Sequence, residues 1–133
     1  MSITTALENH KFKNPYSNDY SKIIDYLLKT IGYANKFYVE IGCNDTIPYD
    51  NTRFLKELNW NGIWIDSCDT VPILDNDKKV GTRLKNKSIK IHHVTKENIN
   101  SLFKQYYIPN SFDFLCLDLG LNVFWIWKEL TYT

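Results

Sequence analysis

The chain has 133 residues, 44% of them hydrophobic and 15% aromatic, which suffices for one domain with a buried core but not for two ordinary domains. Sixteen basic and fifteen acidic residues leave a net charge of +1, so the balance predicts neither nucleic acid nor an anionic membrane as a partner. The sequence has no signal-peptide pattern and no apolar run of about eighteen residues, and we therefore expect a cytoplasmic protein.

The three cysteines, Cys43, Cys68 and Cys116, are an odd number and lack the paired spacing of zinc sites. This pattern argues against a disulfide framework and against a structural metal. We expect reduced, mostly buried thiols and no metal site.

The N-terminal segment 1–17 is polar, contains Asn14-Pro15 and shows no periodicity, so we expect an irregular arm followed by a single domain over 18–133. From Tyr20 onward, apolar residues recur at helical spacing up to Gly32, the expected stop of a helix. They are Ile23, Ile24, Leu27, Leu28 and Ile31.

A strand, a helix and a second strand are predicted next. Residues 36–42 form an apolar run that ends at Gly42, residues 51–59 carry apolar positions at helical spacing, and residues 62–66 form another apolar run that ends at Asp66. Because a βαβ unit has parallel strands, Gly42 and Asp66 are expected at the same edge of the sheet.

The rest of the chain continues the alternation. Residues 72–88 contain Pro72 and Gly81 and few apolar positions, which allows a short or frayed helix. Further predictions are a strand over 88–94, a helix that Thr95 would cap, a strand over 112–118 and a helix over 122–130. Alternating β and α segments predict an α/β fold with a doubly wound, mostly parallel sheet and flanking helices.

Ligands of such sheets bind outside the carboxyl ends of the strands. The candidate site is therefore the edge that would hold Gly42, Asp45, Asp66, Val94 and Asp118. One glycine is a weak signal, because a dinucleotide fingerprint has three, and the missing GxGxxG spacing makes a nicotinamide-dependent oxidoreductase the weakest interpretation.

Carboxylates dominate this edge. Asp66 follows the glycine turn by about two dozen residues, where nucleoside-binding folds place the acceptor for two ribose hydroxyls, although it would also suit a cap of the following turn. Glu40 and Asp45 flank the loop, and their charge suits a cationic ligand better than a pyrophosphate. This favours a sulfonium cofactor over NAD.

Successive blocks of the chain resemble FkbM-like class I methyltransferases, which use S-adenosyl-L-methionine. The blocks run in the family's order over about residues 37–130. They are Tyr38-Val-Glu-Ile-Gly-Cys-Asn-Asp45, Asn51-Thr52, Trp60-Asn-Gly-Ile-Trp-Ile-Asp66, Val94-Thr-Lys-Glu-Asn-Ile-Asn100, and Phe112-Asp-Phe-Leu-Cys-Leu-Asp118 through Asn122 and Trp125-Ile-Trp127.

The resemblance implies a Rossmann-like sheet, of which this chain would hold the N-terminal half with about four strands. It also implies O-methylation of a small molecule or sugar. The implied cofactor-binding residues are Glu40, Gly42, Cys43, Asn44, Asp45, Asp66, Val94 and Thr95, with the loop from Gly42 at the amino acid part, Asp66 at the ribose and the last two near the adenine. Asp118 and Asn122 would face the transferred methyl group and the substrate, as the implied catalytic residues.

The chain departs from the family pattern at several positions. Thr46 stands where a glycine is expected, and the pattern Asp-Ile-Asp-Gly-Asn-Asp is replaced by the segment 118–123, which has Gly120, Leu121 and Val123. Loss of two carboxylates supports an alternative, in which a truncated or degenerate homologue is a non-catalytic cofactor-binding or assembly module. In a sheet of about four strands the fourth strand would be an exposed apolar edge, and such edges tend to pair with another strand. We therefore expect either that the chain forms a homodimer or that it is the shortened remnant of a longer ancestor.

Two smaller groups of residues have more than one interpretation. His92 and His93 could act as bases, but a surface or core role is the commoner one for histidine. Trp125 and Trp127 are expected to pack a helix rather than to form an aromatic cage.

Overall fold

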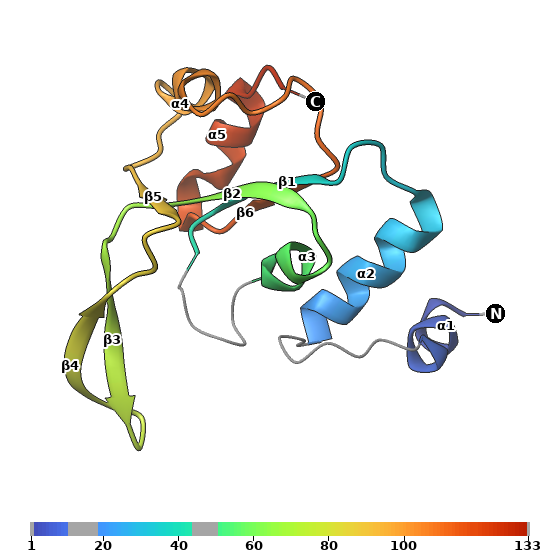
Figure 1. Ribbon diagram of the computed structural model, residues 1–133, viewed down its shortest axis with the longest axis horizontal. Coiled ribbons are helices and arrows are strands. Elements are labelled where there is room, and N and C mark those ends of the chain that lie inside the picture. The colour runs from blue at the N-terminus through green and yellow to red at the C-terminus, as the bar shows by residue number, and fades with distance from the viewer. Residues whose placement is uncertain (1, 11–18, 44–50, 133) are drawn as a thin grey trace.

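The computed structural model describes residues 2–10, 19–43 and 51–132, and it is built around a four-stranded parallel sheet (Figure 1). The strands are β1 (Phe37–Ile41), β2 (Asn61–Asp66), β5 (Ile89–Ile91) and β6 (Phe114–Leu117), in the order β5-β2-β1-β6. The predicted α/β class and parallel sheet are confirmed.

Helices cover both faces of this sheet. α2 (Asp19–Ile31) and α3 (Arg53–Glu57) lie on one face, and α4 (Ile99–Gln105) and α5 (Val123–Glu129) lie on the other (Figure 1). A short 3₁₀ turn, η1 (Gly120–Asn122), leads into α5. The four helices were expected from the apolar periodicity, and the structure differs mainly in their ends.

The core is divided by the alternation of strand side chains. Val39 and Ile41 of β1 pack with Phe103 of α4 in one cluster, whereas Tyr38 packs with Phe54 of α3 in the other. β1 is thus buried on both faces, as its apolar sequence indicates.

The strand order reverses between β1 and β6. β2 and β5 extend the sheet on one side of β1, and β6 pairs with β1 on the other. At the carboxyl end of β1 the Gly42 N–H donates to the Ile65 carbonyl at 2.9 Å, and the Asp118 N–H donates to the Ile41 carbonyl at 2.8 Å. The end of β1 is therefore held from both sides at the point where open α/β sheets bind their ligands.

The segment predicted as a helix over 72–88 is instead an antiparallel hairpin, and that prediction is wrong. β3 (Thr70–Asp75) and β4 (Lys78–Leu84) pair with each other and project from the body (Figure 1). Asn76 and Asp77 form the turn with φ of 47° and 61°, the left-handed geometry that matches strand twist. Pro72 fits because the hairpin has only edge strands.

The N-terminal arm also differs from the expectation, since α1 (Ile3–Asn9) is helical. The Ser2 hydroxyl accepts from the Thr5 N–H at 3.2 Å and caps the helix. Behind α1, His10 Nε2 lies 2.5 Å from Asp25 Oδ2 on α2, so an interaction between elements helps to fix this short helix. A helix of seven residues is too short to show apolar periodicity in the sequence, and the contact between His10 and Asp25 cannot be predicted from it.

The helix that Thr95 was expected to cap has Asn98 as its N-cap and begins at Ile99, three residues later than expected. The Asn98 side chain accepts from the Thr95 N–H at 2.8 Å and donates to the His93 carbonyl at 2.8 Å, which holds the preceding residues in a turn. Polar side chains that bond to nearby backbone delay helix entry in this way.

Asp113 links the entry of β1 to the entry of β6. Its carboxylate accepts from the backbone N–H groups of Ala34, Asn35 and Lys36 at 2.6–2.8 Å. Burial by itself would raise the pKa of Asp113, but these backbone hydrogen bonds outweigh it and lower the pKa.

We expect Asp113 to make the fold less stable in acid. A carboxyl whose pKa is lower in the folded state stabilises the fold above its unfolded pKa of about 4, and this contribution is lost as the pH falls through the folded pKa. The unfolding free energy, measured by urea titration between pH 6 and pH 2.5, should fall in acid, and it should fall less in Asp113→Asn. The exposed Asp69→Asn is the control; equal acid sensitivity of the two variants would contradict the prediction.

Candidate functional site

The four predicted strand ends do meet at one edge of the sheet. Gly42 follows β1, Asp66 ends β2, Val94 lies beyond β5 and Asp118 follows β6, and all four strands run in the same direction. Asn44, Asp45 and Thr46 lie outside the described residues. The geometry of the edge is therefore built from the other predicted residues.

Gly42 is required where it stands. Its φ is +89°, and a Cβ there would lie 2.0 Å from the Asp118 carbonyl oxygen and 2.7 Å from its carbon. A backbone atom cannot move aside as a side chain can. The single glycine of the motif thus allows the chain after β1 to pass against the chain after β6.

Asp66 is engaged by a lysine that the sequence did not single out. Lys85 Nζ forms an ion pair with Asp66 Oδ2 and also donates to the Cys43 carbonyl at 2.9 Å. The Lys85 and Asp66 side chains are only 4% and 13% exposed. A buried ammonium at this position ties β2 to the loop after β1.

Lys85 directly follows the last residue of β4, and its backbone N–H donates to the Asp69 carbonyl at 2.7 Å. In the sequence it is one of a basic cluster over 78–90 whose ordinary interpretation is a solvated surface. The pairing of the two hairpin strands directs this one lysine inward. The helix expected over 72–88 does not predict this position for Lys85.

A cavity of about 340 Å³ lies at the same edge, on the side of α4 and α5. It brings together Val94, Thr95 and Asn122, which the resemblance places near an adenine and a substrate. The remaining lining residues are Lys96, Glu97, Trp125 and Ile126. Trp125 was expected to pack a helix, yet its side chain is 54% exposed and available to a ligand.

The rim of this cavity is charged and ordered. Hydrogen bonds from its own backbone N–H and from the Thr95 hydroxyl lower the pKa of Glu97, which is therefore a carboxylate at neutral pH. Lys96 Nζ lies 3.8 Å from Glu97 Oε1. Together with Thr95 and the Asn122 amide, these groups form the polar part of the cavity, and Val94, Trp125 and Ile126 form its apolar part. Small-molecule sites combine apolar surface with polar groups in this way.

Of the predicted site residues that the structure describes, only Val94, Thr95 and Asn122 line the cavity. Gly42, Cys43 and Asp66 lie at the carboxyl ends of β1 and β2 without lining it, and Glu40 and Asp118 are also outside it. Glu40 is 1% exposed and its carboxylate accepts from the backbone N–H groups of Asn51 and Thr52 at 3.2 and 3.1 Å and from the Thr52 hydroxyl. It holds the segment before α3. Asp118 is exposed beside Gly42 and does not line the cavity with Asn122.

His92, one of the two possible bases, and the thiols of Cys68 and Cys116 lie outside the cavity. His92 Nε2 bonds the hydroxyl of Tyr106, so the imidazole is engaged away from the cavity. Burial raises the pKa of the Cys116 thiol to about 11, and hydrogen bonds to Thr70 lower the pKa of exposed Cys68. Within residues 2–10, 19–43 and 51–132, no group of three His, Cys, Asp or Glu side chains could hold a metal ion.

Comparisons with protein families, with curated proteins and with solved structures found no match to this chain. Among the helices that the structure describes, none is long and apolar enough to cross a membrane.

Proposed function

We propose that the chain binds S-adenosyl-L-methionine at the carboxyl edge of the sheet and is a methyltransferase of FkbM-like type, acting on an oxygen of a small molecule or sugar. The observation that carries the proposal is that the carboxyl edge of the parallel sheet, which holds Gly42 and Asp66, also has a cavity lined by Val94, Thr95 and Asn122. Open α/β sheets bind nucleoside ligands at this place. A Rossmann-like origin of the sheet and a cytoplasmic location belong to the same proposal.

The chemistry of two described side chains, Asp66 and Trp125, supports the proposal. A carboxylate accepts several hydrogen bonds, so Asp66 can bond ribose hydroxyls while it keeps the ion pair with Lys85. The exposed indole of Trp125 offers a face for an adenine. Methyl transfer is an in-line displacement in which the acceptor oxygen bonds the methyl carbon as the bond to sulfur breaks, and the proton of the acceptor hydroxyl passes to solvent. The main task of the Asn122 amide is therefore to orient the acceptor.

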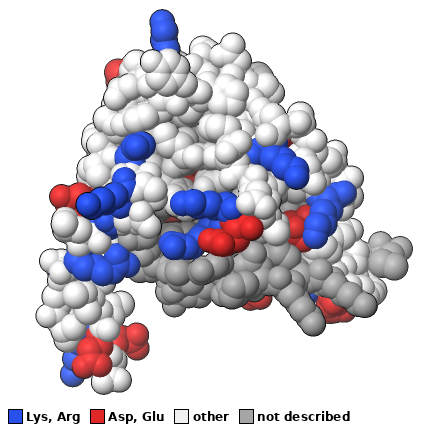
Figure 2. Space-filling model, viewed as in Figure 1, with Lys and Arg blue, Asp and Glu red and all other residues white. Residues whose placement is uncertain are grey.

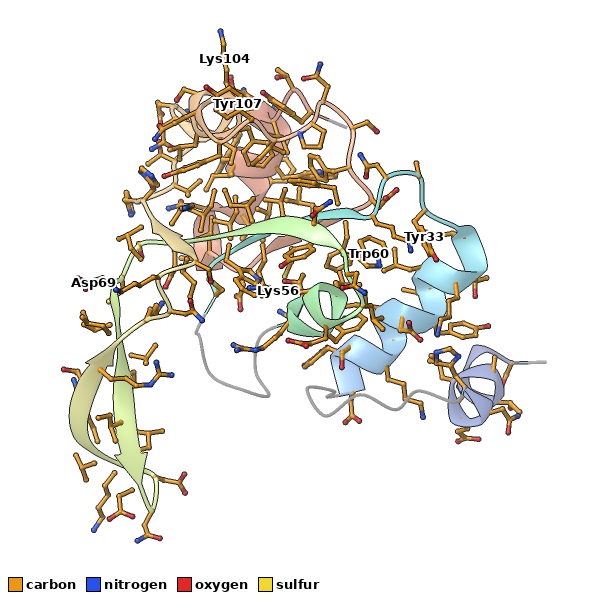
Figure 3. The ribbon with its side chains drawn as sticks, in the orientation of Figure 1. Tyr33, Lys56, Trp60, Asp69, Lys104 and Tyr107 are labelled. Carbon is orange, nitrogen blue, oxygen red and sulfur yellow. The ribbon has the colours of Figure 1, made fainter. Side chains whose placement is uncertain are left out.

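Titration calorimetry with S-adenosyl-L-methionine and S-adenosylhomocysteine tests the cofactor site. Asp66→Asn should weaken binding by about tenfold or more, because a charged acceptor is lost, and Trp125→Ala by about fivefold. Asp69→Asn, an exposed aspartate on the loop before β3, is the matched control (Figure 3). Absence of heat with both ligands at millimolar concentration would overturn the proposal.

Asp66→Asn also leaves Lys85 buried without its charge partner, so its thermal unfolding must be compared with that of the unsubstituted chain. The double variant Asp66→Asn, Lys85→Met avoids this problem, because it removes the buried lysine charge as well as the carboxylate that would accept from the ribose. If this double variant is folded and still binds the cofactor at full strength, Asp66 is no part of the site.

The alternative function is a non-catalytic cofactor-binding or assembly module, and one observation favours it. The Asp66 carboxylate, which the proposal assigns to the ribose hydroxyls, already forms a largely buried ion pair with Lys85. Binding of S-adenosylhomocysteine without transfer of a labelled methyl group to any acceptor in a cell extract would support the alternative. A homodimer through β6, one of the two outer strands of the described sheet, remains an expectation under either function.

A further inference from the structure

The first half of β2 has a side without a described strand partner, at the end of the sheet opposite the cofactor edge. β5 pairs with β2 only from Trp64 to Asp66, so no described strand pairs with the outer side of residues 61–63. On its inner side this part of β2 pairs with β1 from Phe37 onward. A groove of about 590 Å³ runs along the open segment.

Gly62 and the ring of Tyr38 form the floor of the groove. A Cβ at Gly62 would lie 2.4–2.5 Å from ring atoms of Tyr38, so the tyrosine ring fills the space that a larger residue would need. Trp64 continues the floor on the α3 side. The tyrosine ring covers one side of Gly62, but Gly62 is still exposed and lines the groove.

A lysine stands on each side of this edge. Lys56 of α3 lies over the Trp64 ring, 4.8 Å from its centroid, and Lys90 of β5 lies 5.8 Å from the centroid of Tyr106, which follows α4. Figure 3 shows Lys56 beside α3 and Tyr107 beside α4, on opposite sides of β2. Among the described residues that line the groove, none is acidic. Over the molecule as a whole the charges are mixed, since Figure 2 shows Asp and Glu side chains among the Lys and Arg side chains.

Tyr107 adds a strained aromatic residue to the rim. Its φ is +53°, and the Ile108 N–H donates to the Phe103 carbonyl at 3.0 Å, a helix end at which glycine is the usual residue. The Tyr107 side chain is 92% exposed, so core packing does not compensate the strain. Strain of this kind concentrates at binding sites.

We propose that the open edge of β2 binds a short extended peptide segment with two adjacent acidic residues. An extended segment can add to a free strand edge through its backbone. Its successive side chains then point to opposite faces of the sheet, so neighbouring acidic side chains would reach Lys56 on one face and Lys90 on the other. This site is separate from the cofactor edge and does not depend on the proposed methyltransferase function.

Fluorescence polarisation with a labelled, blocked tetrapeptide, valine–glutamate–aspartate–valine, tests the inference. Lys56→Gln and Lys90→Gln should each weaken binding about two- to fivefold, the range for partly exposed ion pairs, and the double variant should lose both contributions. The matched control is Lys128→Gln, because Lys128 also lies over an aromatic ring, 5.6 Å from the centroid of Trp125, but away from the groove. Circular dichroism shows whether each variant is folded.

Two further peptides separate the contributions of charge and backbone. The glutamine–asparagine version keeps the shape and removes the charges, and it should bind at least tenfold more weakly. An N-methylated version keeps the charges and cannot pair with a strand, and it should also lose binding. Equal binding of either peptide would overturn the proposal, as would no binding of the acidic peptide at millimolar concentration or equally strong competition by citrate, which would indicate a site for small anions.

Discussion

Gly42→Ala is expected to cost about 3 kcal/mol or more of unfolding free energy, a large fraction of the total for a domain of this size. Part of the cost is the φ of +89°, which an alanine adopts only under strain. The larger part is the contact of the new Cβ with the Asp118 carbonyl, 2.0 Å from the oxygen, because relief requires the chains after β1 and β6 to separate. Urea unfolding followed by tryptophan fluorescence measures this loss.

Gly120→Ala is the matched control for this prediction. Gly120 also has a positive φ, +66°, but no atom lies within 4 Å of the position that a Cβ would take there, so only the backbone strain applies. We expect a loss of about 1 kcal/mol at this residue. Equal losses at Gly42 and Gly120 would show that the close approach of the two chains does not constrain the fold.

The elements that could be predicted from the sequence are those that local patterns determine. The apolar runs of β1 and β2 and the helical stripe of α2 indicate buried strands and an amphipathic helix, and the structure confirms all three. Their alternation fixes parallel pairing, which in turn brings Gly42, Asp66, Val94 and Asp118 to one edge. This much of the site follows from topology alone.

The residues that could not be predicted depend on contacts between distant segments. The hairpin β3–β4 turns at Asn76-Asp77, whereas the expectation of a short helix over 72–88 rests on Pro72, Gly81 and the scarcity of apolar residues and takes no account of this turn. Only once the hairpin is in place does Lys85 reach Asp66, 19 positions earlier in the chain. The sequence likewise shows Glu40 as one of several acids near the loop, and only the structure shows it buried under Thr52.

Glu40→Gln is expected to lower the unfolding free energy by about 3 kcal/mol, although the change conserves shape. The carboxylate accepts from the backbone N–H groups of Asn51 and Thr52 and from the Thr52 hydroxyl, which in turn accepts from Trp64 Nε1 at 2.9 Å. The amide of glutamine has only one accepting oxygen, so its NH₂ would face a donor in this buried network. A buried donor left without an acceptor carries its full desolvation cost.

Glu57→Gln, an exposed change on α3, is the control, and Thr52→Val completes a double-mutant cycle with Glu40→Gln. Because the two residues share one hydrogen-bonded network, the losses in the double variant should be smaller than the sum of the single losses by about 1–2 kcal/mol. The same variants distinguish the two roles assigned to Glu40. If Glu40→Gln is as stable as Glu57→Gln but loses S-adenosylhomocysteine binding, its carboxylate serves the cofactor. If it loses stability and a folded fraction still binds, Glu40 supports the site only by holding α3 against β1.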